Sequence, residues 1–90
     1  MKQYGKRDKN QIAIIKDLRA SGFSVVDLAS VGGGCPDILV GARGRNYLFE
    51  IKCDSKAKMR PMQIDFFTLW HGQMHRINNS EEAINIIGGK

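Results

Sequence analysis

Hydrophobic and polar residues follow two periods along the chain, and these periods predict an alternation of helices and strands. Apolar residues at helical spacing predict a first helix from about Asp8 to Ala20, which Ser21-Gly22 ends. Runs rich in β-branched and aromatic residues between glycines and polar residues predict short strands. The other predicted elements are a strand over 23–28, a hairpin over 36–52, a helix over 61–71, a strand over 72–77 and a helix over 81–87.

The two later helices have recognisable ends. Pro61 suits the start of the second helix, because a first helical position needs no N–H. Ser80 is expected to cap the last helix, and Gly88-Gly89 ends it. The resulting order, α-β-β-β-α-β-α, predicts a mixed sheet flanked by helices. On the second helix, one apolar stripe is expected to lie in the core: Met62, Phe66 and Leu69.

The hairpin over 36–52 is the most informative stretch. Arg43-Gly44 is its predicted two-residue loop, because Gly44 takes a positive φ at little cost. Ala42 then faces Arg45, and every other pair follows by counting outward. A slip of one residue would move each side chain to the other face of the sheet, so the predictions that follow depend on this register.

Two acids and a lysine meet on one face of this hairpin. The register places Asp37 directly opposite Glu50, and Lys52 projects from the same face two residues later. Opposed like charges destabilise a sheet unless something neutralises them. A bound divalent cation would do so, and hard oxygen ligands suit Mg²⁺ or Mn²⁺. The pattern therefore predicts a metal site at Asp37 and Glu50.

The start of the first helix allows two interpretations. Residues 1–7 are expected to form a basic tail, and Asp8 and Gln11 share the face that carries Ile14 and Leu18 further along. In one interpretation Asp8 is an N-cap and Gln11 lies at the rim of the core. In the other, this end of the helix overlooks the acidic patch of the hairpin.

These residues resemble a known family. Pro36-Asp37 followed by Glu50-Ile51-Lys52 resembles the PD-(D/E)XK nuclease signature. The run VGGGCPDILVG over 31–41 resembles the VRR-NUC branch, in particular its small stand-alone viral members. Gln63 matches a Gln that this branch places near its active site. The resemblance covers roughly residues 7 to 87 and implies a restriction-endonuclease-like α/β core, a mixed β-sheet flanked by helices.

The resemblance also implies roles for individual residues. Asp37 and Glu50 would hold the metal, and the backbone carbonyl of Ile51 would be a further ligand. Lys52 would orient or deprotonate the attacking water, or stabilise charge in the transition state. Gln63 would position Lys52 or the phosphate. Members of the branch use an acidic residue from their first helix at the metal site, for which Asp8 is the candidate and Asn10 or Gln11 the alternatives.

Contacts with nucleic acid are expected from a glycine-rich loop and from basic residues. Gly32-Gly33-Gly34 lacks the spacing of a P-loop, so it is either a simple turn or a flexible segment that lets a backbone approach Asp37. Basic side chains beside a metal site suit phosphate contacts, although they could also be a solvated surface. The candidate nucleic-acid contacts are Gly33, Gly34, Lys56, Lys58, Arg60 and Arg7.

Composition narrows the class of protein. Ninety residues are expected to form one domain over 1–90, and a net charge of +5 with a pI near 9.5 favours a polyanionic partner. No apolar run could span a bilayer and no signal peptide is evident, so a cytoplasmic protein is expected, in the host cell for a viral protein. Two cysteines are too few for a disulfide scaffold. His71 and His75 lack a third ligand, which argues against zinc.

The function expected from the resemblance is phosphodiester hydrolysis by a Mg²⁺- or Mn²⁺-dependent endonuclease. Stand-alone relatives imply a homodimer that cleaves four-way (Holliday) junctions in DNA, because two active sites suit two symmetric cuts. The last helix and apolar residues such as Trp70 or Ile87 are candidates for the dimer surface. The alternatives are a flap or single-strand nuclease of the same fold, a non-catalytic nucleic-acid-binding module, and a regulatory protein-interaction domain. DNA and RNA both remain open as the substrate.

Overall fold

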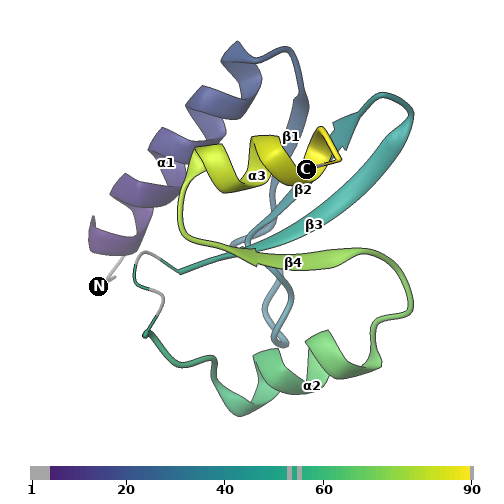
Figure 1. Cartoon of the computed structure of the whole chain (residues 1–90). Coiled ribbons are helices and arrows are strands. Elements are labelled where there is room, and N and C mark those ends of the chain that lie inside the picture. Colours follow the sequence, from purple (N-terminus) through teal and green to yellow (C-terminus); the bar gives the residue numbers. More distant parts are fainter. Residues whose placement is uncertain (1–4, 53, 55, 90) are drawn as a thin grey trace.

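The order of elements agrees with the prediction (Figure 1). The structure is a computed structural model that describes residues 5–52, 54 and 56–89; for residues 5–9 it describes the backbone alone. The elements are α1 (Gly5–Ala20), β1 (Ser24–Asp27), β2 (Ile38–Ala42), β3 (Arg45–Ile51), α2 (Pro61–Leu69), β4 (Met74–Ile77) and α3 (Ser80–Ile87).

The four strands form one mixed sheet in the order β1-β2-β3-β4. The first three are antiparallel neighbours, and β4 runs parallel to β3. Ala42 pairs with Arg45 and Ile38 with Phe49, so the predicted hairpin register is confirmed over these strands. Arg43 and Gly44 both have positive φ, 55° and 78°, as the two central residues of a type I′ turn require.

The hydrophobic core lies on one face of the sheet. Alternate residues of β2 and β3, such as Val40 and Phe49, point to this face and are fully buried. α1 contributes Ile14 and Leu18, and α3 contributes Ala83, so these two helices cover the core face together (Figure 1). Helical spacing on α1 and period-two spacing on the strands therefore meet in a single core.

Two predicted helix starts are wrong. α1 begins at Gly5 and not near Asp8, so the basic tail is shorter than expected and Asp8 is an interior helical residue and not an N-cap. α3 is capped by Asn79, whose side chain accepts the Glu82 N–H at 2.9 Å, and not by Ser80. The Ser80 hydroxyl instead donates to the Asp17 carboxylate at 2.6 Å, which links α3 to α1.

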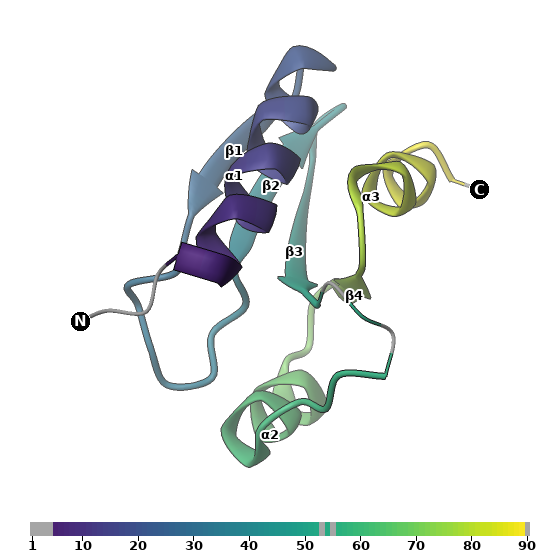
Figure 2. The same ribbon diagram turned by 90° about the vertical axis from the view of Figure 1, so that its left-hand side faces the viewer.

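The predicted core stripe on α2 is also wrong. None of the residues of α2, all of which are described, is buried; Met62 is 59% exposed and Leu69 is 72% exposed, while Phe66 is half-buried. The physical reason is the position of the helix. α2 lies beyond one end of the strands, away from α1 and α3, as two perpendicular views show (Figures 1 and 2).

Candidate active site

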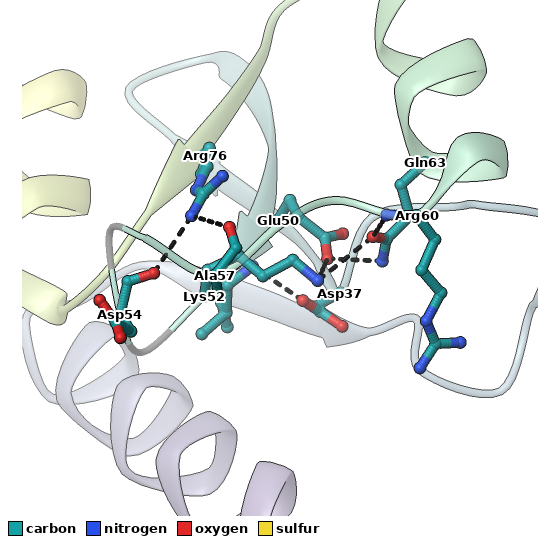
Figure 3. A network of polar contacts seen from close by, with 9 residues as sticks. Asp37, Glu50, Lys52, Asp54, Ala57, Arg60, Gln63 and Arg76 are labelled. Atoms are coloured by element: carbon teal, nitrogen blue, oxygen red, sulfur yellow. Dashed lines mark hydrogen bonds and ion pairs between the residues drawn. The ribbon is translucent and has the colours of Figure 1, made fainter.

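The hairpin brings Asp37, Glu50 and Lys52 to the end of the sheet that is nearer to α2. Asp37 directly precedes β2, Glu50 lies in β3 and Lys52 directly follows β3. Both carboxylates are buried, with Asp37 7% and Glu50 2% exposed. The side chains predicted from the register therefore do lie together (Figure 3).

The local pairing at Asp37 differs in detail from the predicted one. The ladder of paired residues ends at Ile38 and Phe49, one step before Asp37 and Glu50. The Asp37 N–H donates to the Phe49 oxygen at 3.1 Å, and the Asp37 Oδ2 accepts the Ile51 N–H at 2.8 Å. These bonds anchor the Asp37 carboxylate against the backbone of β3, beside the Glu50 side chain.

Gln63 connects the acid and the lysine. Its Nε2 donates to Glu50 Oε2 at 2.8 Å, and its Oε1 accepts from Lys52 Nζ at 3.2 Å (Figure 3). Lys52 Nζ lies 3.4 Å from the same Glu50 oxygen, so the three side chains form a closed triangle. Gln63 Oε1 also accepts the Arg60 N–H at 2.8 Å, which caps the first turn of α2. The amide therefore ties α2 to the acidic patch.

The glycine-rich loop lines a cavity beside these residues. The cavity has a volume of about 430 Å³ and is bordered by Gly32 to Cys35 and Asp37 on one side and by Arg60 to Gln63 on the other. Gly34 has a φ of +81°, and a Cβ atom there would collide with the Met62 backbone oxygen. The loop can thus contact the start of α2 only because this position has no side chain. Gly33, with a φ of +65°, has open space around it.

Cys35 is a residue of this cavity to which sequence reasoning gave no role. Burial raises the pKa of its thiol above the ordinary value, and the negative charges of Asp37 and Glu50 raise it further. Its neighbourhood is therefore unfavourable for a thiolate. Its position two residues before Asp37 was the available signal.

Of the candidate residues on α1, the structure links Gln11 to β1 and not to the acidic patch. Gln11 is 2% exposed and its Nε2 donates to Asp27 Oδ1 at 2.8 Å, which links the middle of α1 to the end of β1. Asn10 is half-buried. Asp8 and Arg7 belong to α1, but their side chains lie outside the described part of the chain. Asp27 is exposed and also accepts the Ala29 N–H.

The predicted basic contacts line the loop between β3 and α2. Lys56, Lys58 and Arg60 are all exposed, and Arg60 borders the cavity. Sequence reasoning missed Arg76 of β4, which is the ladder partner of Glu50. The available signal in the sequence was a charged residue in the interior of a short predicted strand.

A membrane-spanning helix and a cluster of potential metal ligands are both absent from the described residues. Within that part of the chain, no helix has the length and apolar character needed to cross a membrane. Among the same residues, no cluster of three or more His, Cys, Asp or Glu side chains is arranged to hold a metal ion. Among the described side chains, the acidic donors of the site are the carboxylates of Asp37 and Glu50.

A mixed sheet flanked by helices, with the Pro-Asp and Glu-x-Lys residues at the end of its hairpin, is the arrangement of the PD-(D/E)XK nuclease class. A solved structure described as a VRR_NUC domain shares the fold, with a TM-score of 0.68 and 21% identity, over 90% of this chain and 92% of that chain. The family model described as archaeal Holliday junction resolvase (Hjc) matches residues 1–71. The chain belongs to this family, and it is a nuclease. No curated protein matches it.

Proposed function

We propose that the protein is a divalent-metal-dependent endonuclease that resolves four-way DNA junctions. The observation that carries this proposal is the cluster of Asp37, Glu50, Lys52 and Gln63 beside one cavity. A chain that only bound nucleic acid would gain nothing from two buried carboxylates next to each other, because like charges destabilise such a site. Membership of a resolvase family favours junctions over flaps or single strands as the substrate.

The residues present fit Mg²⁺ or Mn²⁺. Two carboxylates supply hard oxygen ligands, and the backbone carbonyl of Ile51 follows directly in the chain. Mg²⁺ keeps several waters and often takes only one or two carboxylates together with phosphate oxygens of the substrate, so a third acid is not needed. When bound, such an ion lowers the pKa of a coordinated water and stabilises charge on the phosphoryl group.

The side chains around the acids have separate tasks. Lys52 carries its ammonium group 3.4 Å from Glu50, where it can orient the attacking water or stabilise negative charge as it develops. Gln63 holds both partners with one amide and so fixes the direction of Lys52. Asp37 accepts the Ile51 N–H from the backbone of β3, which fixes the orientation of its carboxylate.

The substrate would approach over the basic loop and the glycine loop. Lys56, Lys58 and Arg60 are exposed, and they belong to the loop whose last residue, Arg60, borders the cavity. Phosphate contacts from such residues supply most of the affinity for DNA. Gly33, which has no side chain and open space around it, leaves room for a sugar-phosphate backbone beside Asp37. The overall charge of +5 supports the same partner.

A homodimer is part of the proposal, with α2 as its contact surface. α2 exposes Met62, Leu69 and the neighbouring Trp70, and it carries no basic residue, so it suits a protein partner better than DNA. The earlier candidate Ile87 is excluded, since it is only 5% exposed and belongs to the core. Sedimentation of Leu69→Asp should show a monomer, whereas Ile12→Asp, at an exposed apolar position of α1, should remain a dimer.

The experiment that tests the function is cleavage of a labelled four-way junction, with linear duplex and flap controls, in Mg²⁺, Mn²⁺ or EDTA. We expect paired cuts that need the metal. Lys52→Ala should be at least about a hundredfold slower, because removing one group that stabilises the transition state typically has that effect. Lys16→Ala, which removes an exposed lysine of α1, is the matched control and should cleave normally.

The other outcomes of this experiment are informative. Cleavage of flaps or duplex without cleavage of junctions would keep the nuclease and contradict the resolvase. Tight, salt-sensitive binding without cleavage in any metal would mean a non-catalytic binding module.

A further inference from the structure

Arg76 links β4, next to Glu50, to the basic loop between β3 and α2. In the parallel ladder it is the partner of Glu50, and its guanidinium group extends from β4 toward the loop between β3 and α2 (Figure 3). Its Nη2 donates to the backbone oxygens of Asp54, at 3.1 Å, and Ala57, at 2.6 Å. Since Nη2 carries two hydrogens, both are used in holding this loop.

The segment that Arg76 contacts is a compact turn. The Ala57 N–H donates to the Asp54 backbone oxygen at 2.9 Å, and the Lys56 N–H donates to Asp54 Oδ1, also at 2.9 Å. The Asp54 carbonyl thus serves both the turn and Arg76. Because Lys56 lies inside the turn, the direction of its side chain depends on whether the turn is held in place.

The same loop has a second anchor at its other end. The Arg60 N–H donates to Gln63 Oε1, and the amide of Gln63 contacts Glu50. Arg76 is the strand neighbour of that same Glu50. The loop that carries Lys56 and Lys58 is therefore fixed at both ends by side chains adjacent to one carboxylate of the site.

We infer that Arg76 is a positioning residue, which holds the basic loop so that Lys56 and Lys58 meet substrate phosphates at a fixed place relative to Glu50. This role rests on the proposed function. An arginine suits it because the planar guanidinium presents several donors in a fixed geometry, whereas a lysine ammonium is a single point of charge. Arg76 acts through the loop, and its Nη2 has no hydrogen left for a phosphate.

The first test measures the loop itself and needs no DNA. Amide hydrogen exchange of Ala57 should be about tenfold faster in Arg76→Met and in Arg76→Lys, because charge-assisted bonds that hold the turn are lost or distorted. Exchange of the strand amides of β2 and β3 in the same samples corrects for any change in global stability. Unchanged exchange of Ala57 would overturn the inference even if the protein is a nuclease.

The second test asks whether Arg76 acts through the lysines. In single-turnover cleavage of a junction, Arg76→Met should raise the half-saturating protein concentration about tenfold and change the maximal rate by less than about threefold, since the loss concerns phosphate contacts. Lys16→Met controls for the loss of one positive charge and should behave as the wild type.

A mutant cycle decides between indirect and direct action. In a Lys56→Gln/Lys58→Gln background, Arg76→Met should weaken binding less than about twofold further, because residues that act as one unit are not additive. A full tenfold effect in that background would mean that Arg76 contacts DNA itself and would overturn the positioning role. If the junction is not cleaved at all, the proposed function fails, while the exchange result still stands on its own.

Discussion

α2 and α3 are helices of nearly equal length, nine and eight residues, yet they are held in opposite ways. α3 buries Ala83 and Ile87 in the core and is tied to α1 by the bond between Ser80 and Asp17. α2 buries no residue, although its sequence is the more apolar of the two. Its described polar links to the rest of the chain include those of Gln63 to Glu50 and Lys52.

The difference separates stability from function within ninety residues. α1, the core face of the sheet and α3 share one set of buried contacts, which supplies most of the free energy of folding. α2 and the loops beside it carry the cavity, the glycines and the basic residues. Elements with few buried contacts open more easily than a core, so the side that binds substrate is also the side that can adjust to it.

The strongest test of this separation of stability from function truncates one side chain in the core and one on α2. Phe49→Ala in the core should lower the free energy of unfolding by about 3–5 kcal/mol, since Phe49 is fully buried. Leu69→Ala on α2, measured at protein concentrations where the chain is monomeric, should change it by less than about 0.5 kcal/mol, because that residue is 72% exposed in the single chain. Urea denaturation measures both values. Equal losses at the two positions would contradict the separation, once the protein concentration is varied to allow for a dimer.

The core side was the part that sequence reasoning could predict. Period-two alternation and the Arg43-Gly44 turn determine the hairpin register, and the register in turn brings Asp37 and Glu50 together. Helical spacing likewise identified Ile14 and Leu18 as core residues. Each of these predictions depends only on residues that are close along one element or on opposite sides of one tight turn.

The α2 side could not be predicted in the same way. Spacing placed Met62 and Leu69 in the core, because an apolar stripe does not reveal whether the fold leaves a surface for it to pack on. Gln63 was assigned to the site by resemblance alone. Arg76 and Asp54 meet across a loop and a parallel strand, and that contact depends on long-range topology which no local pattern encodes.

The glycine loop offers a test on the α2 side that has its own control. Gly34→Ala should lower stability by about 1–3 kcal/mol, because its new Cβ would collide with the Met62 backbone oxygen. Gly33→Ala shares the positive φ but has open space, so only the backbone strain, about 1–2 kcal/mol, remains. Gly34→Ala should also displace α2 and Gln63, which predicts junction cleavage at least about tenfold slower than in Gly33→Ala. Identical behaviour of both variants would show that the contact with Met62 is unimportant.

The smallest expected effect comes from a histidine on the core side. His75 is half-buried against the rings of Tyr47 and Phe49, and this burial lowers its pKa below the ordinary value of 6.5. The folded state therefore disfavours the protonated ring, while the unfolded chain accepts the proton near pH 6.5. Stability is fully present above about pH 6.5 and falls as the pH drops below that value.

Urea denaturation between pH 5 and pH 8 tests this expectation. His75→Phe, which keeps an aromatic ring in the cluster, should remove the part of the pH dependence that His75 causes. His71→Gln is the matched control, because it removes an exposed histidine beside α2. The decline of stability at low pH should persist in this variant. A decline that persists in His75→Phe and disappears in His71→Gln would put the titrating group on the α2 side. Such a result would contradict the separation of stability from function, because a group outside the core would then control the pH dependence of folding.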